Sequence, residues 1–513
     1  MKRLAELLRD VEFRLVSGSA DVAVRAVGCD SRAIENGDVF VCLPGYQTEG
    51  GEQRADRHAF IADAVGRGAI AVVVERDVAV PAGVTVVRVR DCWAAIAAMA
   101  CAFYNHPSGS LTVVGVTGTS GKTSTTYFVE SVLASAGHRP VRLGTVEYRF
   151  GDTVFPAAQT TPEAPELQRL LRLAVDGGFT ATVMEVSSHA LELRRVAGTA
   201  FDVAVFTNIS QDHLNFHPDM HHYLRTKGRL FEELGSGGKA ATAVVNADDA
   251  GAAHIIAVNR GALLTFGLDA TAAVSARQID TGLHGTHFIA TTPIGDFPVT
   301  LPHLGEFHVH NALAAIATGV ALRIDVFHIQ RGLATTPPVP GRFELVDCGQ
   351  DFRVAVDYAH KPDALARLLR SARLLHPRRI ITVFGCGGDR DRSKRPLMGR
   401  LAAELSDVVI ITSDNPRSEC PERIIDEIAA GVREMAGCAP QVSTEPDRTT
   451  AIAAAINMAQ ADDLVLIAGK GHETYQLLGD RRIHFDDREV ARQALRSRLG
   501  ARARRVSPLP GKS

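Results

Sequence analysis

Short apolar runs alternate with stretches of helical periodicity along most of this chain. In the first hundred residues both kinds of stretch are brief, which is typical of a small α/β domain. The breaker-rich cluster 105–109 (Asn-His-Pro-Ser-Gly) then favours a linker, so the pattern predicts a first domain over residues 1–108. The polar stretch 50–58 is interpreted as a loop. The expected strands are 38–43, 69–75 and 85–89, and the expected helices are 59–67 and 92–104.

Between residues 109 and 340 the alternation becomes regular, and its strands are apolar throughout. Such strands are typical of a parallel sheet covered by helices on both faces. From 264 to 302 the pattern changes to short alternating strands with glycine turns, which suggests an antiparallel extension. The proline-rich stretch 336–341 closes this second domain, because proline lacks the N–H group of a ladder or helix. The expected strands are 112–116, 181–186, 203–207 and 241–245, and the expected helices are 124–136, 222–234 and 309–322.

A second α/β repeat follows and predicts a third domain over residues 341–513. Its strands end in glycine- or proline-rich loops, and ligands of open α/β sheets bind beyond those ends. The basic, proline-containing tail from about 500 to 513 is interpreted as disordered. The expected strands are 353–357, 380–384, 407–412 and 463–468.

Composition narrows the class of protein. With 513 residues the chain exceeds one hydrophobic core, and about three domains are expected. A formal net charge of −2 gives no electrostatic argument for nucleic acid or an anionic membrane as partner. Eight scattered cysteines without a CxxC pair, and no apolar run near the ~18 residues of a membrane span, predict a cytoplasmic protein.

The stretch 111–124 carries the clearest chemical signal. A β-branched run leads into Gly118-Thr-Ser-Gly-Lys-Thr123, and a helix-compatible segment follows. A glycine loop between a strand and a helix start presents N–H groups and the helix dipole to an anion. Lys122 would reach the terminal phosphates and the Thr123 hydroxyl would ligate Mg²⁺. The loop is the short G-x-x-G-K-T form, because Val116 stands where the longer pattern has its first glycine.

Two further strands end in polar residues. Glu185 follows the second strand of the central domain, where a carboxylate suits the Mg²⁺ of a bound nucleotide. His213 lies in the polar segment after the next strand, and Lys227 lies in the helix beyond it. The histidines of 217–222 (HPDMHH) fit no strong zinc-ligand spacing.

Several motifs occur together in one order: GTSGKT, EVSSHAL, TNISQDHLNFH, HNALAAI, GRFE, VDYAHKP, FGCGGDRDRSKRP, SDNPR and GKGHE. This set resembles the Mur ligases and, within them, the tripeptide-forming branch, over residues 25–490. The resemblance implies an α/β fold of three domains: a small UDP-sugar-binding domain, a central P-loop ATPase domain, and a Rossmann-like amino-acid-binding domain. It also implies a monomeric, ATP-dependent acid–amino-acid ligase of cytoplasmic peptidoglycan precursor synthesis.

For that chemistry the resemblance implies an acyl phosphate, formed by ATP on the D-Glu γ-carboxylate of UDP-MurNAc-L-Ala-D-Glu. Lys122 would contact the transferring phosphate, Thr123 and Glu185 would hold one Mg²⁺, and His213 would help to hold a second. Lys227 matches the family lysine that CO₂ carbamylates and that then supports a metal. The implied ATP contacts are Gly118, Thr119, Ser120, Gly121, Lys122, Thr123, Ser124, Asn208, Asn311, Arg342 and Asp357.

The resemblance assigns the nucleotide-sugar end to the first two domains. Leu193 departs from the family form, which has glutamine there, so one substrate contact differs while Arg195 remains. The implied contacts are Cys29, Ser31, Tyr46, Gln47, Thr48, Thr160, Thr161, Ser187, Leu193 and Arg195.

The acceptor amine is implied by Asp414-Asn-Pro-Arg417 to be meso-2,6-diaminopimelate. This amine differs from lysine by a second carboxylate, which a guanidinium binds bidentately. Arg417 is the family mark of that recognition, and Glu473 would bind the distal ammonium. The implied pocket comprises Arg390, Asp414, Asn415, Pro416, Arg417, Gly469 and Glu473.

Three alternatives stay open at this point. The acceptor could be L-lysine or another diamine. Folylpolyglutamate synthetase shares the ATP chemistry but leaves the DNPR motif and the uridine-pocket motifs unexplained. A catalytically idle relative could serve as a binding subunit, although intact Lys122, Glu185 and Lys227 argue against that.

Overall fold

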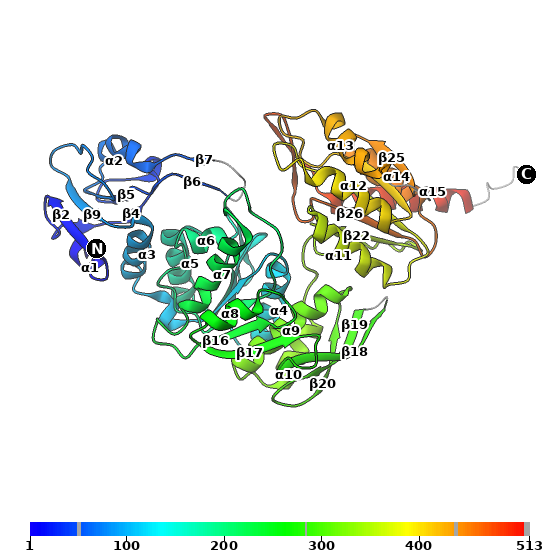
Figure 1. Cartoon of the computed structure of the whole chain (residues 1–513), viewed down its shortest axis with the longest axis horizontal. Helices are drawn as coiled ribbons and strands as arrows, with labels where there is room; N and C mark the ends of the chain where they lie inside the picture. Colours follow the sequence, from blue (N-terminus) through cyan, green and yellow to red (C-terminus); the bar gives the residue numbers. More distant parts are fainter. Residues whose placement is uncertain (49–52, 283–284, 435–439, 507–513) are drawn as a thin grey trace, which may run out of the picture. The chain divides into compact units, whose positions relative to one another are not determined.

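The computed structural model describes residues 1–48, 53–282, 285–434 and 440–506, with side chains to residue 500. The chain forms two compact units. The first comprises Met1–Arg277, Ile289–Val299 and His310–Thr335, and the second comprises Gln278–Phe288, Thr300–Val309 and the chain from Thr336 onward. Figure 1 colours the chain from blue at the N-terminus to red at the C-terminus.

The N-terminal part of the first unit contains a five-stranded sheet in the order β2-β9-β8-β5-β4. β9, β8, β5 and β4 are parallel, and β2 pairs antiparallel with β9. Asp91 begins α3 by accepting the Ala94 N–H, a normal N-cap. The elements are β1 Lys2–Arg3, α1 Leu4–Leu7, β2 Phe13–Ser17, β3 Ala23–Val24, β4 Val27–Gly28, η1 Ser31–Ala33, β5 Val39–Val41, β6 Tyr46–Gln47, β7 Gln53–Arg54, η2 Arg57–Phe60, α2 Ile61–Gly66, β8 Ala71–Val74, β9 Thr85–Val89, α3 Cys92–Phe103 and η3 Pro107–Ser110.

The central part contains the large sheet, in which β11, β14, β10, β15, β16 and β17 follow one another as parallel neighbours. The antiparallel strands β12 and β13 extend it beyond β11. The elements are β10 Thr112–Thr117, α4 Lys122–Ser135, β11 Pro140–Leu143, β12 Glu147–Phe150, β13 Thr153–Pro156, α5 Ala164–Asp176, β14 Ala181–Glu185, α6 Ser188–Glu192, β15 Val203–Phe206, α7 Met220–Glu232, β16 Thr242–Asn246, α8 Ala252–Val258, β17 Ala262–Gly267, β18 Val274–Gly282, β19 Gly285–Thr291, β20 Phe297–Leu301, α9 Glu306–Ala321 and α10 Val326–Ala334.

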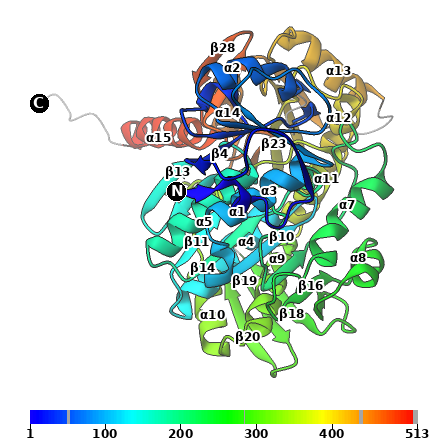
Figure 2. The ribbon, with the colours of Figure 1, turned by 90° about the vertical axis from the view of Figure 1, so that its left-hand side faces the viewer.

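Alternate residues of these strands face opposite layers. Val113, Met184 and Phe206 join the buried cluster that includes α5, α7 and α8, and Figures 1 and 2 show these helices beside the strands. Because both faces are covered there, the residues of the central strands β10, β14, β15 and β16 are nearly all buried and mostly apolar. Many of the polar side chains considered below therefore lie at the ends of these strands and in the loops that follow them.

The second unit contains a six-stranded sheet in the order β21-β22-β26-β23-β24-β25, parallel except for β21. One face packs on α11, α12 and α13, and the other packs on α14 and α15. This is the Rossmann-like arrangement that the sequence predicted. The elements are β21 Glu344–Leu345, β22 Arg353–Asp357, α11 Pro362–Arg373, β23 Ile380–Phe384, α12 Lys394–Leu405, β24 Val408–Thr412, α13 Pro421–Arg433, β25 Gln441–Glu445, α14 Arg448–Met458, β26 Leu464–Ala468, β27 Tyr475–Leu478, β28 Arg481–His484 and α15 Asp487–Val506.

Three expectations need correction. Residues 500–506 belong to α15 rather than to a disordered tail, because Ala491 and Leu495 anchor that helix in the core; residues 507–513 lie outside the described residues. The expected loop at 50–58 contains β7, which pairs with β6, while 49–52 are not described. β18 begins parallel to β17, through Phe266 and Gly267, so the extension is not antiparallel at its start.

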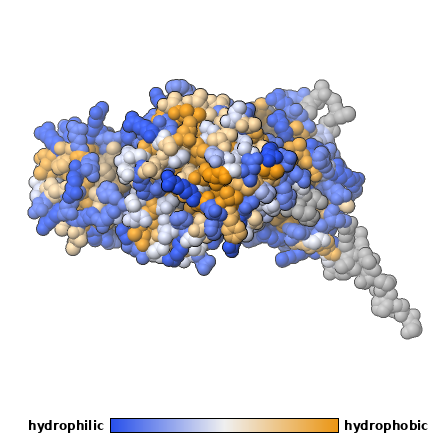
Figure 3. All heavy atoms as spheres, turned by 90° about the horizontal axis from the view of Figure 1, so that it is seen from below, coloured by the Kyte–Doolittle hydropathy of each residue, from blue (hydrophilic) through white to orange (hydrophobic). Residues whose placement is uncertain are grey.

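The surface is mixed. On the face that Figure 3 shows, apolar side chains gather in patches among polar ones. Exposed large apolar residues such as Phe327 and Leu374 are normal for a folded surface and by themselves identify no partner. Within the described part of the chain no helix is long and apolar enough to cross a membrane.

Candidate active site

The glycine loop between β10 and α4 has the geometry of a phosphate-binding loop. Gly118 and Gly121 have φ of 147° and 86°, which side-chain-bearing residues rarely adopt. A Cβ on Gly118 would overlap the Thr207 hydroxyl, and one on Gly121 would lie 2.6 Å from Asn311 Oδ1. Glycine is therefore required at both positions, and the loop closes tightly on the start of α4.

The segment after β15 holds this loop in shape. The Thr119 N–H donates to the Asn208 carbonyl (2.9 Å), and the Ser120 N–H donates to Asn208 Oδ1 (2.9 Å). The Thr207 hydroxyl donates to the Ser120 carbonyl at 2.7 Å. Lys122 Nζ lies over the loop and donates to the carbonyls of Gly118 (2.8 Å) and Thr119 (3.1 Å). A cation thus stands where terminal phosphates would enter.

Glu185 closes the other side of the loop. Its Oε1 accepts the Thr123 hydroxyl at 3.0 Å, and Thr145 donates its N–H (2.9 Å) and its hydroxyl (3.0 Å) to the same carboxylate. Only 1% of Glu185 is exposed. A hydroxyl and a buried carboxylate, both hard oxygen donors, meet at the start of α4 as the sequence expected, and this donor set suits Mg²⁺.

Lys227 lies beneath the same loop. It is 1% exposed, its Nζ donates to the Gly118 carbonyl at 3.0 Å, and Nζ lies 4.4 Å from the centre of the Tyr223 ring. The Tyr223 hydroxyl lies 3.2 Å from the Thr119 hydroxyl. α7 begins at an N-cap, where Asp219 accepts the His222 N–H, and it brings Lys227 to the loop from over a hundred residues away.

His213 belongs to a group of rings, and its own contacts in that group are edge-to-face. Its φ is 53°, its Nε2 lies 3.1 Å from Asp212 Oδ2, and its ring contacts those of His189 and Tyr223. His217 bonds Ser188 Oγ (2.9 Å), and burial lowers its pKa to about 3, so it stays neutral at physiological pH. Among the described residues no three His, Cys, Asp or Glu side chains form a group that could hold a metal ion.

The expected nucleotide-sugar residues of both predicted domains meet in the first unit. The Tyr46 hydroxyl donates to Glu163 at 3.0 Å, and Arg195 Nη2 lies 3.2 Å from the same carboxylate. Arg195 also donates to the Gln159 side chain and to the Thr161 carbonyl. It is only 3% exposed, and the described residues offer no acceptor to its Nε–H. A buried donor of this kind suits an anionic ligand group.

The rest of that set lies partly in the N-terminal part and partly around α6 and Glu185 of the central part. Ser31 is buried in η1, beside Asp63. Cys29 offers its carbonyl to Arg57 at 2.7 Å, and burial raises the pKa of its thiol to about 11, so it is not a reactive thiolate. Gln47 and Thr48 adjoin Tyr46 on β6, and Leu193 is buried at the end of α6. Thr160, Thr161 and Ser187 lie beside Glu185, through bonds that link Thr145 to Thr160, and Thr161 to Glu185 and Ser187.

In the second unit, the loops after β23, β24 and β26 form one cluster. Arg417 has φ of 53° and is held by backbone bonds to Leu477 (3.0 Å) and Gly479 (2.7 Å). Its Nη1 donates to the Gly388 carbonyl at 2.7 Å. A Cβ on Gly387 would lie 2.9 Å from Arg417 Nη1 and 3.7 Å from Arg390 Cγ, so both arginines flank this glycine.

Asn415 is the centre of the cluster. Its Oδ1 accepts the Leu477 N–H (3.0 Å) and Lys470 Nζ (3.2 Å), and its Nδ2 donates to Glu473 Oε2 (2.9 Å). Lys470 Nζ also lies 2.9 Å from Glu473 Oε2. Burial raises the pKa of Glu473 above its ordinary value, against the lowering effect of Lys470. Gly469 lies against Asp414, and Pro416 is buried.

Arg342 and Asp357 also lie in the second unit. Asp357 accepts the N–H groups of Phe343 and Ala359, each at 2.8 Å, and burial raises the pKa of its carboxyl. The guanidinium of Arg342 lies 4.7 Å from the centre of the Tyr358 ring. The other nine expected ATP contacts, including Asn311 and the buried Ser124, lie in the first unit.

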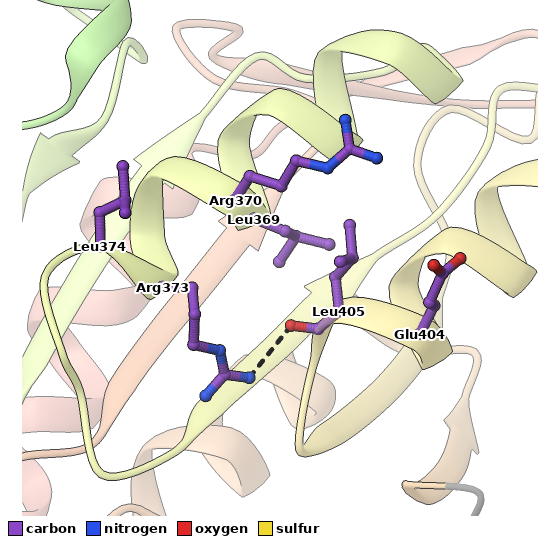
Figure 4. A pocket seen from close by; sticks show the side chains of 6 residues that line it. All are labelled: Leu369, Arg370, Arg373, Leu374, Glu404 and Leu405. Carbon is purple, nitrogen blue, oxygen red and sulfur yellow. Dashed lines mark hydrogen bonds between the residues drawn. The ribbon is translucent and has the colours of Figure 1, made fainter.

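One groove lies outside these clusters, and another adjoins the cluster around Arg195. Figure 4 shows the one of about 340 Å³ between α11 and α12, lined by Leu369, Arg370, Arg373, Leu374, Glu404 and Leu405. Its residues stand at the C-terminal ends of their helices, hence at the amino ends of the strands, opposite the edge where such folds bind ligands. The other, of about 280 Å³, lies between the β12–β13 hairpin and α5 and includes Gln159 and Glu163.

Sequence reasoning missed several residues of these clusters. Thr145 and Glu163 contact expected site residues only through long-range packing, and so does the Tyr223 hydroxyl with Thr119, so no local pattern indicated these contacts. Lys470 stands inside the GKGHE motif that was noted, and that position could have identified it. Nothing in the sequence around Arg57 indicated its contact with Cys29.

Comparison with known proteins agrees with this geometry. Three family models match in succession: "Mur ligase family, catalytic domain" over residues 23–104, "Mur ligase middle domain" over 116–319, and "Mur ligase, glutamate ligase domain" over 341–471. The chain is 43% identical over 509 residues to the UDP-N-acetylmuramoyl-L-alanyl-D-glutamate–2,6-diaminopimelate ligase of Geobacter metallireducens, covering 96% of this chain and 98% of the relative. The ligase of the same name from Geobacillus kaustophilus is 45% identical, with 94% and 96% covered.

Solved structures show the same fold. A structure of a UDP-N-acetylmuramoyl-L-alanyl-D-glutamate–2,6-diaminopimelate ligase superposes with a TM-score of 0.69 at 31% identity, covering 97% of this chain and 99% of that one. The MurF ligase of Thermotoga maritima, in complex with ADP, superposes with a TM-score of 0.62 at 19% identity, covering 94% and 99%, and supports the fold alone. With three successive family models and near-full-length relatives above 40% identity, the chain belongs to the Mur ligase family.

Proposed function

We propose that this protein is the ATP-dependent ligase that joins meso-2,6-diaminopimelate to the D-Glu γ-carboxylate of UDP-MurNAc-L-Ala-D-Glu. The observation that carries the proposal is the pair of arginines, Arg390 and Arg417, that flanks Gly387 beside Asn415, whose side chain bonds Glu473. Diaminopimelate carries at its distal end one carboxylate and one ammonium. Two guanidiniums and one carboxylate complement that end, whereas lysine offers only the ammonium.

The ATP half of the reaction rests on the glycine loop. Lys122 is positioned to neutralise the phosphate that is transferred to the substrate carboxylate, and the loop N–H groups to hold the phosphates that stay on the nucleotide. The amine of the acceptor then attacks the acyl phosphate, and phosphate leaves as the amide forms. Both steps gather negative charge, so fixed cations and N–H donors stabilise them.

The donors at the start of α4 fit Mg²⁺, which binds proteins through few carboxylate and hydroxyl oxygens and keeps ligands for phosphate and water. Thr123 and Glu185 would hold one ion and His213 would help to hold another. Bound Mg²⁺ would neutralise charge on the phosphates. Thr145 orients Glu185 for that purpose, with two donors on one carboxylate.

Lys227 is the proposed site of carbamylation. A lysine that is 1% exposed, against a carbonyl and an aromatic face, is costly to keep charged. Reaction of the neutral amine with CO₂ would give a carbamate beside the phosphate loop, an anion able to support a metal ion.

The nucleotide-sugar substrate would bind along the N-terminal sheet and the edge of the central one. Ser31, Tyr46, Gln47 and Thr48 would hold the uridine diphosphate. Arg195, with its spare buried Nε–H, would bind a carboxylate of the dipeptide arm together with Thr160, Thr161 and Ser187. On this proposal residues 1–108 bind the sugar nucleotide, 109–340 bind ATP, and 341–513 bind the amino acid.

The test is phosphate release by purified protein with ATP, Mg²⁺, UDP-MurNAc-L-Ala-D-Glu and one amine at a time. Release with meso-2,6-diaminopimelate, at a kcat/KM well above that with L-lysine, supports the proposal. Release only with lysine would show that the protein is a ligase whose acceptor is lysine rather than diaminopimelate. No release with any amine, from protein that binds ATP, would favour a binding subunit.

A further inference from the structure

The loops that carry the proposed acceptor site are tied together by a buried arginine that no site motif contains. Arg448 begins α14, is 1% exposed, and lies under the carboxyl ends of β24 and β26. Its Nη1 donates to the Ser413 carbonyl at 3.2 Å, and its Nη2 donates to the Ala468 carbonyl at 3.0 Å. Each carbonyl immediately precedes an acceptor-site residue, Asp414 in one loop and Gly469 in the other.

This guanidinium spans two strands that are not neighbours. β23 lies between β24 and β26, so the two carbonyls belong to strands about 10 Å apart, at ~4.8 Å per strand. The planar fork of arginine donates to both carbonyls while it also makes two bonds to Asp487, four bonds in all, and the three N–H groups of a lysine ammonium cannot make four. The β23 end between them is Gly385, where a Cβ would lie 2.9 Å from the Asp414 nitrogen. The ends of β26, β23 and β24 thus lie close together, and Arg448 bonds the outer two.

Asp487 holds the arginine in this position. Its two oxygens accept Arg448 Nε and Nη2, each at 2.7 Å, and both side chains are fully buried. Asp487 is the first residue of α15, where the helix dipole favours a carboxylate. The ion pair is bidentate, and the remaining bonds of Arg448 go to the two loop carbonyls. A pair placed only to join α14 to α15 would not need those two bonds.

We propose that Arg448, held by Asp487, is a positioning residue for acceptor recognition: it fixes the spacing between the loop of Asn415 and Arg417 and the loop of Lys470 and Glu473. This inference rests on the proposed function, because it concerns the same pocket. The Asn415 side chain joins the two loops through its bonds with Glu473 and Lys470. Arg448 bridges them through the carbonyls of Ser413 and Ala468.

The chain offers a matched control at the other end of the same strands. Arg379 and Asp463 directly precede β23 and β26 and form a similar arginine–aspartate pair, with Nη2 to Oδ2 at 2.6 Å. This pair ties the sheet at its amino edge, away from the acceptor loops. Arg379→Lys therefore tests what loss of an arginine fork does to this sheet without changing the loops.

The experiment measures KM and kcat of full-length wild type, Arg448→Lys, Asp487→Asn and Arg379→Lys, with diaminopimelate and ATP varied in turn. A misplacement of about 1 Å can lower a rate about a hundredfold. We expect acceptor KM to rise about tenfold or more in Arg448→Lys, and less in Asp487→Asn, which keeps both carbonyl bonds. KM for ATP should stay within about twofold, the preference for diaminopimelate over lysine should fall, and Arg379→Lys should keep wild-type constants.

Urea unfolding of each variant separates positioning from stability. If Arg448→Lys fails to fold, Asp487→Asn tests the inference by the same two measurements: a raised KM for the acceptor and an unchanged KM for ATP. Folded variants with wild-type acceptor KM would overturn the inference, and so would equal rises in acceptor and ATP KM or the same rise in Arg379→Lys. If wild type instead uses another amine, the proposed acceptor fails, and KM for that amine then tests the positioning role.

Discussion

The phosphate loop and the acceptor cluster differ in how their groups are brought together. The phosphate loop is one continuous stretch, 117–124, whose shape follows from two glycines and a helix start. The acceptor cluster takes groups from three loops, 385–390, 413–417 and 469–473, which meet only because three parallel strands end side by side. A continuous motif depends on its own residues, whereas an assembled one depends on buried groups outside it.

The largest effect is expected at the continuous site. Lys122→Ala removes the ammonium that lies over the loop, and loss of one such group from a transition state lowers kcat by about 10²–10³-fold or more. Phosphate release would measure this, with the melting temperature as the check on folding. An unchanged rate would refute the assignment of the ATP site.

At the acceptor cluster, Arg417→Lys keeps the charge and removes the fork. Loss of a bidentate charge-assisted pair is expected to raise KM for diaminopimelate about 10–100-fold. L-lysine, which lacks the second carboxylate, should be affected far less. Initial rates with the two amines measure the ratio, and an equal loss for both would mean that Arg417 does not bind the distal carboxylate.

Glu473 is expected to give the acceptor cluster a pH dependence. Burial raises its pKa, so as pH falls the carboxylate is protonated earlier than an ordinary glutamate, and the ammonium of the acceptor loses its partner. KM for diaminopimelate should therefore rise as pH is lowered through the raised pKa. Glu473→Gln should raise KM about tenfold at neutral pH and remove the pH dependence. If the KM for diaminopimelate still rises at low pH in that variant, the titrating group is a residue other than Glu473.

The smallest expected effect compares two threonines near Glu185. Thr145→Val removes one hydroxyl donor from the Glu185 carboxylate and leaves the backbone N–H, so kcat should fall about three- to tenfold and the Mg²⁺ requirement should rise. Thr182→Val, on the same strand as Glu185, removes a buried hydroxyl to which the described residues offer no partner. It should leave activity unchanged. Equal losses in both variants would mean that Thr145 acts only through packing.

Most of the fold could be predicted from apolar patterning. The strands 85–89, 353–357 and 380–384 occur with the expected bounds as β9, β22 and β23. The apolar pattern predicted the elements least well in polar or mixed segments. β25, with the half-exposed sequence QVSTE, has no apolar run to reveal it, and α15 continues through charged residues because one stripe of the helix is buried. Sheet order was beyond the sequence, since pairing of β26 between β22 and β23 depends on three-dimensional packing.

By itself the sequence determined the phosphate loop, because glycine torsions and a helix start are local properties. It also determined the motifs whose order identifies the family. Tertiary structure decided what supports them: Thr145 on Glu185, Tyr223 beside Lys227, Lys470 between Asn415 and Glu473, and Arg448 beneath two strand ends. Tyr223 and Lys227 share α7, and Lys470 and Glu473 share one loop. Their contacts with the phosphate loop and with Asn415 join distant parts of the chain, which only the packed sheet brings within hydrogen-bonding distance.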